Sequence, residues 1–118
     1  MDYDLLCSRI FEIDPKIRFA AIFHKSGDLI VGRMRDGLDS YLNKEETERT
    51  IRHTILRWQT RDKVTQKIGI AEWAMAKYGK VFRFTVPLNN QKLILVSSEL
   101  DVNHSEIVQK IVELAKAE

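Results

Sequence analysis

Two short apolar runs bent around a polar turn constrain the fold more than any other stretch of the chain. The segment from Phe19 to Arg33 reads FAAIFHKSGDLIVGR. Aromatic and β-branched residues favour extended backbone, and Gly27 can adopt a positive φ without steric cost. The pattern predicts two antiparallel strands, Ile17 to Phe23 and Leu29 to Met34, joined by a tight turn. Alternate residues of this hairpin are expected to fill the core.

A capping signal predicts a long central helix. Asn43 is followed three residues later by Glu46, so the Asn side chain can accept a hydrogen bond from an unpaired amide of the first turn. Ile51 and Trp58 fall on one face at helical spacing, and acid-first Glu–Arg pairs lie on the exposed side. We expect a helix from Lys44 to Arg61 with one buried stripe.

Shorter helices are expected near both ends of the chain. Leu6 and Ile10 belong to an apolar stripe that ends before Pro15, because the residue before a proline avoids helical angles. Asn103 and Glu106 repeat the Asn-x-x-Glu start signal before the last apolar stripe. The two patterns predict one helix in each terminal region.

After Gly69 the apolar period changes from helical to alternating. Three strands are predicted, from Ile70 to Lys77, from Val81 to Val86 and from Lys92 to Ser98. The complete order is helix, strand, strand, helix, strand, strand, strand, helix. This order predicts an α+β fold with a single five-stranded antiparallel sheet flanked by helices.

Composition narrows the class of protein. With 118 residues, 44% hydrophobic and 31% charged, the chain is expected to form a single domain over 1–118. Its apolar runs are far shorter than the roughly 20 residues of a membrane helix. The opening MDYD does not resemble a secretory signal, so we expect a cytoplasmic protein without a membrane partner. One cysteine and three scattered histidines predict no disulfide, metal or other cofactor.

The strongest candidate for a binding surface lies in the second half of the central helix. From Arg49 to Lys67 the only acid is Asp62. Arg57 and Arg61 lie four residues apart on one helix face, and guanidinium groups suit bidentate contact with carboxylates or phosphates. Arginine and tryptophan are also enriched in interface hot spots. The candidate interface residues are Arg49, Arg52, Arg57, Trp58, Arg61 and Trp73.

The same residues also have a purely structural interpretation. Trp58 is then part of the core, and the arginines are solvated or pair with Glu45, Glu48 or Glu72. For Trp73 the two alternatives are a half-buried sheet position and an interface anchor.

No residue spacing marks a catalytic centre. His24 and Lys25 fall at the hairpin tip without a serine, cysteine or carboxylate at a recognised spacing, so we interpret them as a solvated loop. Cys7 follows Leu6 in the first helix and is interpreted as a small packed residue. We expect a protein that is not an enzyme.

The hairpin and the order of elements resemble a known family. In roadblock domains, which belong with the longin and profilin-like folds, an apolar strand, a polar turn with glycine and a second apolar strand precede the central helix, as Phe19 to Arg33 does here. The segments IDPKIRFAAIF, ILRWQTR and AEWAMAKY also resemble short uncharacterised archaeal proteins.

This resemblance implies a non-catalytic role. Roadblock-like domains typically dimerise through the central helix and a neighbouring strand, and they serve as platforms for small GTPases, motors or signalling scaffolds. Carried over to this chain, the dimer surface comprises the helix from Lys44 to Arg61 and the strand from Ile70 to Lys77. The expected function is a homodimeric protein-interaction or regulatory module.

Two other functions stay open. A small-molecule sensor would hold a ligand between sheet and helices, and its pocket would be lined by Phe19, Phe23, Phe82 and Phe84. Nucleic-acid binding would use the basic segment from Arg49 to Lys67, and it is the weaker alternative because the net charge is only +2 and exposed stacking aromatics are lacking.

Overall fold

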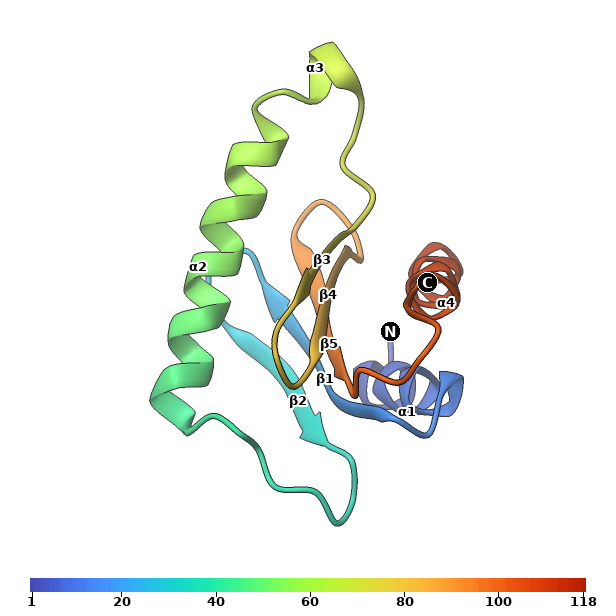
Figure 1. Cartoon of the computed structure of the whole chain (residues 1–118). Helices are drawn as coiled ribbons and strands as arrows, with labels where there is room; N and C mark the ends of the chain where they lie inside the picture. The colour runs from blue at the N-terminus through green and yellow to red at the C-terminus, as the bar shows by residue number, and fades with distance from the viewer.

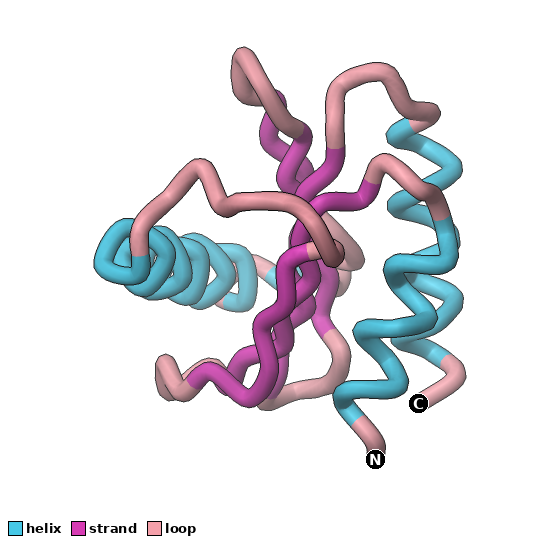
Figure 2. Tube along the Cα trace, turned by 90° about the horizontal axis from the view of Figure 1, so that it is seen from below, coloured by secondary structure: helices cyan, strands magenta, loops and turns pink.

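A five-stranded antiparallel sheet separates two layers of helices in the computed structural model, which describes residues 1–118 (Figure 1). Two helices cover one face and a single long helix covers the other, as the view along the sheet shows (Figure 2). This architecture confirms the predicted α+β fold and order, with one short helix added after the central helix. The helices are α1 (Tyr3–Ile13), α2 (Lys44–Asp62), α3 (Thr65–Ile68) and α4 (His104–Lys116), and the strands are β1 (Ile17–His24), β2 (Leu29–Met34), β3 (Ala74–Lys77), β4 (Phe82–Pro87) and β5 (Lys92–Ser98).

The hairpin forms as predicted, but its first strand is buried on both sides. Gly27 occupies the turn with φ at 110°. Because the strand order is β2-β1-β5-β4-β3, β1 lies inside the sheet and β2 at its edge. Ala20 and Ile22 therefore face α1 and α4, whereas Ala21 and Phe23 face α2. The expectation that alternate residues fill one core is wrong for β1, because helices cover both faces of the sheet.

Capping explains where the helices begin. Asn43 Oδ1 accepts from the Glu46 amide at 2.8 Å, and Glu46 Oε1 accepts from the Asn43 amide at 3.0 Å, which completes the predicted capping box of α2. At α4 only one of the two bonds forms, because Asn103 Oδ1 accepts from the Glu106 amide at 3.1 Å without a return bond. At α1 the Asp2 side chain accepts from the Leu5 amide at 3.0 Å, a cap that was not predicted from the sequence.

The predicted strand from Ile70 to Lys77 is too long, because only Ala74–Lys77 pairs with a neighbour. β3 has one partner, β4, in a register that matches Ala74 with Thr85. Continued toward the N-terminus, that register would place residue 72 opposite Pro87, which has no amide hydrogen to donate. β3 is therefore a short edge strand, and the segment before it crosses over the sheet without pairing.

The two faces of the sheet carry separate cores. Seventeen buried residues form the cluster under α1 and α4, and it includes Phe82 and Phe84. Seven form the cluster under α2, where Phe23 is buried and Phe19 packs against it. The predicted pocket lined by all four phenylalanines is wrong, because they lie on opposite faces of one sheet.

Candidate binding groove

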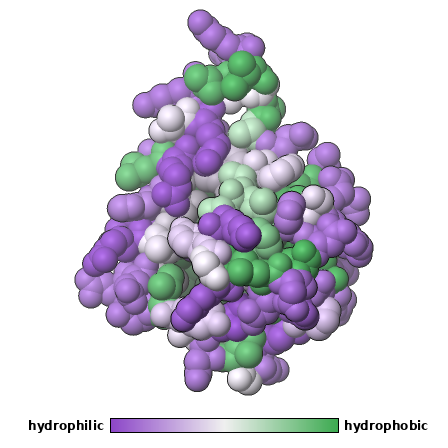
Figure 3. Space-filling model, in the orientation of Figure 1, coloured by the Kyte–Doolittle hydropathy of each residue, from purple (hydrophilic) through white to green (hydrophobic).

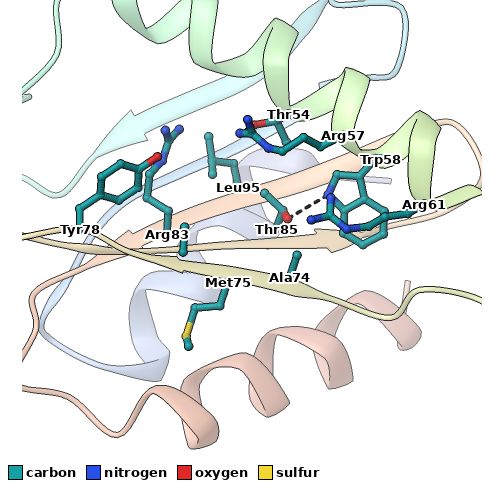
Figure 4. Close-up of a pocket in the computed structure, with 11 residues that line it drawn as sticks. Thr54, Arg57, Trp58, Arg61, Ala74, Met75, Tyr78, Arg83, Thr85 and Leu95 are labelled. Atoms are coloured by element: carbon teal, nitrogen blue, oxygen red, sulfur yellow. Dashed lines mark hydrogen bonds between the residues drawn. The ribbon is translucent and has the colours of Figure 1, made fainter.

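An open groove of about 310 Å³ lies between the second half of α2 and the β3–β4 side of the sheet (Figure 4). We call it the arginine groove. It is defined by Arg57, Trp58, Arg61, Tyr78, Arg83 and Thr85. Arg57 and Arg61 come from α2, and Arg83 comes from β4 on the opposite wall. Residues distant in sequence thus meet at one site.

Trp58 forms the floor of the arginine groove. Its side chain is only 1% exposed, and its Nε1 donates a hydrogen bond of 2.9 Å to Thr85 Oγ1 on β4. The Arg61 guanidinium carbon lies 5.0 Å from the centre of the Trp58 ring, at cation–π distance. Trp58 is therefore a core residue that fixes α2 to the sheet and supports Arg61.

Threonine hydroxyls hold the other two arginines. Arg57 donates from Nη2 to Thr54 Oγ1 at 3.4 Å, and Arg83 donates from Nη2 to Thr50 Oγ1 at 3.2 Å. Both hydroxyls also donate to backbone carbonyls of α2, which fixes their orientation. The arginines of the groove are thus tethered by neutral groups rather than by carboxylates.

The pairing of arginines with Glu45, Glu48 or Glu72 occurs only once. Arg49 lies 3.3 Å from Glu45 in an i,i+4 pair on the exposed side of α2. None of the ion pairs of the protein includes Arg52, Arg57 or Arg61. No direct ion pair within the chain therefore neutralises the arginines of the groove.

The structure divides the six candidate interface residues into three groups. Arg57, Trp58 and Arg61 meet in the arginine groove. Arg49 and Arg52 lie outside it on the exposed surface of α2. Trp73 precedes β3 and is 47% exposed.

Burial of Trp58 also bears on nucleic-acid binding. Apart from His53, it is the one aromatic residue of the basic segment from Arg49 to Lys67. A buried indole offers no face on which a base can stack. The segment therefore presents charge without a stacking platform.

A second hollow of about 430 Å³ adjoins the arginine groove and shares Tyr78 and Arg83 with it. We call it the aromatic hollow. Arg18 lies 4.3 Å from the Tyr41 ring and pairs with Glu99 at 2.7 Å, so its charge is already compensated. The hollow is lined chiefly by Phe19, Met34, Tyr41, Leu42, Lys80 and Val81.

Sequence reasoning missed Tyr41, Tyr78 and Arg83 as site residues. A signal for Arg83 was present: it interrupts the apolar run between Phe82 and Phe84, and alternation places it on the opposite face of β4. Only the packing of the whole sheet shows that this face of β4 lies under α2. Nothing in the local sequence marks Tyr41 or Tyr78.

The hairpin tip is a tether between elements. His24 Nδ1 accepts from the Ser26 amide at 3.1 Å, within the turn itself. Lys25 lies 3.3 Å from Asp62 at the end of α2. One ion pair therefore links the tip to the end of α2, and both side chains have partners within the chain.

Cys7 is enclosed in the core under α1 and α4. Burial raises the pKa of its thiol to about 11, the nearby Arg33 charge lowers it by less, and the thiolate is correspondingly disfavoured. Such a thiol is a poor nucleophile at neutral pH. No group of three or more His, Cys, Asp or Glu side chains is arranged to hold a metal ion.

Apolar side chains are exposed around the edge strand β3. In the space-filling view apolar surface gathers at the α3 end of the molecule, above β3 (Figure 3). The opposite edge strand, β2, also exposes apolar side chains at Leu29 and Ile30. The exposed apolar residues on the β3 side are Val64, Ile68, Ile70, Trp73, Met75 and Tyr78.

Comparisons with known proteins identify the fold. A Roadblock/LC7 domain from Streptomyces avermitilis is 11% identical with a TM-score of 0.76, and the match covers 99% of this chain and 94% of that one. Myxococcus xanthus MglB is 10% identical with a TM-score of 0.74, covering 95% and 87%. An MglB described as having a tetrameric arrangement is 4% identical with a TM-score of 0.72, covering 97% and 88%. The fold is therefore that of roadblock domains.

Comparison of the sequence with family models assigns the chain to a family. A model described as a family of unknown function (DUF6659) matches residues 1–118. A search of curated proteins found no match.

The resemblance to short archaeal proteins stays a prediction. No helix of the protein has the length and apolar character that crossing a membrane requires.

Proposed function

The chain belongs to the family of unknown function DUF6659 and has a roadblock fold, and from these premises we propose that it is a non-catalytic homodimeric interaction module. It acts as one domain over residues 1–118, located in the cytoplasm. The second copy contacts α2 and the β3 edge, and a protein such as a small GTPase binds the assembled dimer.

The observation that carries this proposal is the exposed edge of β3. This strand has one hydrogen-bonded neighbour, so its other side presents free backbone groups to a second chain. Trp73 and Met75 expose apolar surface there, and Leu56 exposes apolar surface on α2. A two-fold axis beside β3 would pair two such edges and cover these side chains from both copies.

The dimer is tested by the solution mass of three proteins at tens of micromolar concentration. We expect the wild type at twice the 13.8 kDa of one chain. Trp73→Glu places a charge on the proposed surface and should give a monomer. Ile30→Glu is the matched control, because Ile30 is an exposed apolar residue on the opposite edge strand, and it should leave the dimer intact.

Two results would contradict the dimer through β3. A monomeric wild type removes the homodimer altogether. Dissociation by Ile30→Glu but not by Trp73→Glu moves the interface to β2. The description of one structurally similar MglB as tetrameric supports self-association in this fold and does not specify an edge.

The protein partner is tested separately by affinity purification from the source cells. Recovery of a GTP-binding protein with the wild type, and its loss with Trp73→Glu, would support a partner that requires the dimer. Recovery without any GTP-binding protein would contradict the small-GTPase part of the proposal.

A second candidate function is a small-molecule sensor. Its pocket is not the one expected from the phenylalanines but the arginine groove with the adjoining aromatic hollow. Together they reach the size range of small-ligand sites, roughly 300–1,000 Å³. The uncompensated charge of the groove favours this candidate, and it indicates the kind of ligand.

A further inference from the structure

We propose that the arginine groove binds the phosphate group of a small organic phosphate whose apolar or aromatic body lies in the aromatic hollow. This inference rests on the second candidate function, for which it names the ligand class. It does not require the dimer, because every residue that it uses belongs to one copy of the chain.

The charge of the groove is the first argument. Arg57, Arg61 and Arg83 line it, and no aspartate or glutamate is among its lining residues. None of the three takes part in an ion pair. Like charges held around one cavity repel one another, and an anion with two charges relieves that repulsion. A phosphate monoester carries a charge of about −1.5 to −2 at pH 7.

The free hydrogen-bond donors are the second argument. A guanidinium group has five N–H donors. Arg57 and Arg83 each use one Nη2 on a threonine hydroxyl, and Arg61 uses none within the chain. The tethers fix the positions of the side chains and leave most donors available. The close-up shows Arg57 on α2 and Arg83 and Tyr78 on the sheet side reaching into the space between the two layers (Figure 4).

These donors match a phosphate better than a carboxylate. A phosphate monoester has three terminal oxygens, each able to accept from a different guanidinium, whereas a carboxylate has two. Paired N–H donors on each guanidinium also suit bidentate binding to phosphate. Three arginines on two walls of one groove therefore favour the phosphate.

The aromatic hollow determines the rest of the ligand. It begins at Tyr78 and Arg83, which it shares with the arginine groove, so a group attached to the bound phosphate extends directly into it. Phe19 and Met34 provide apolar surface, and the Tyr41 ring is exposed there. Arg18 lies against Tyr41 with its charge compensated by Glu99. Lys80 also lines the hollow, 5.2 Å from the Tyr41 ring and without an ion pair, so the hollow suits an apolar or aromatic body that carries no positive charge.

The inference is tested by calorimetric titration at low salt with three probes: phenyl phosphate, inorganic phosphate and benzoate. Phenyl phosphate should bind most tightly, because inorganic phosphate leaves the hollow empty and benzoate offers the arginines only two oxygens. Arg83→Gln should weaken phenyl phosphate binding about tenfold, the effect of losing one charge-assisted contact. Arg52→Gln is the matched control, because Arg52 is an unpaired arginine on the exposed surface of α2, outside the groove. It should leave binding unchanged.

Two further variants separate the parts of the site. Tyr41→Ala should weaken phenyl phosphate and leave inorganic phosphate unchanged, because Tyr41 lines only the hollow. Arg57→Gln should weaken both. It also provides a second test of the groove if Arg83→Gln does not fold, since the Arg57 side chain carries only a long hydrogen bond to Thr54.

Three results would overturn the inference. The first is no binding of phenyl phosphate at millimolar concentration. The second is an equal loss of binding in Arg52→Gln and Arg83→Gln, which indicates general charge attraction. The third is binding of an acidic peptide while phenyl phosphate gives no heat, which makes the groove a protein-docking site. Because solution mass is measured on the same samples, a monomer that binds phenyl phosphate contradicts only the dimer, and a dimer that does not bind contradicts only this inference.

Discussion

The two faces of the sheet differ in how completely they are covered. On one face α1 and α4 enclose a cluster of 17 buried residues. On the other, α2 alone encloses seven, although it is the longest helix of the protein. The more completely buried face is therefore not the face with the candidate site. A single helix cannot cover five strands, and the uncovered remainder forms the arginine groove and the aromatic hollow.

We expect the greatest loss of stability when a buried isoleucine is truncated, and each face of the sheet offers one for comparison. Ile111 on α4 is 0% exposed and Ile55 on α2 is 7% exposed. Truncation to alanine removes the same atoms at both positions, but the cavity is more completely enclosed at Ile111. We expect Ile111→Ala to lower the free energy of unfolding by about 4 kcal/mol and Ile55→Ala by about 2 kcal/mol. Urea unfolding with an unchanged m-value measures both. Equal losses would show that the two faces are packed equally well.

A somewhat smaller loss of stability is expected at high pH, where the buried thiol of Cys7 on the well-covered face ionises. Burial raises the pKa of Cys7 from 9.0 to about 11, so the folded protein keeps the thiol proton to higher pH than the unfolded chain does. The contribution of the protonated Cys7 thiol to the free energy of unfolding is therefore fully present below about pH 9, and it is lost as pH rises toward 11. The loss is on the order of 2–3 kcal/mol.

Urea unfolding across this pH range tests the Cys7 effect. Lysines and tyrosines also titrate there, so the quantity that matters is the difference between the wild type and Cys7→Ala. We expect this difference to shrink as pH rises, because the variant has no thiol to ionise. A difference that stays constant with pH would show that Cys7 is accessible to water.

We expect the smallest losses of stability when the N-terminal caps of α2 and α4, one helix from each face, are removed. Asn43→Ala breaks the two-way capping box of α2, whereas Asn103→Ala removes a single bond at α4. We expect losses of about 1 kcal/mol and about 0.5 kcal/mol. Amide hydrogen exchange should also speed up more in the first turn of α2, where fewer tertiary contacts hold the helix. Faster exchange at the start of α4 would reverse the ranking.

Sequence reasoning predicted the elements well wherever the signal is local. The Asn43 capping box fixed the start of α2, and Gly27 fixed the turn of the hairpin, because each acts on backbone only a few residues away. The length of β3 could not be predicted in this way. Its pairing stops where the ladder on β4 reaches Pro87, more than ten residues later in the chain.

The candidate site was predicted only in part. Arg57 and Arg61 were identified from their spacing on one helix, and both line the arginine groove. Trp58 shares that segment but is turned into the core. Arg83 was missed, because its membership depends on which face of β4 lies under α2.

Local signals in the sequence were enough to predict the order of the main helices and strands, the caps at Asn43 and Asn103 and the turn at Gly27, because hydrogen bonds and dihedral preferences act between neighbours in the chain. The positions of β1 and β5 inside the sheet, and the facing of Phe23 and Phe84 toward different helices, follow from the packing of the whole fold. The same packing joins Arg83 to the arginines of α2. Which face of a strand is buried, and against what, follows from covering both faces of the whole sheet at once, and no single segment contains that information.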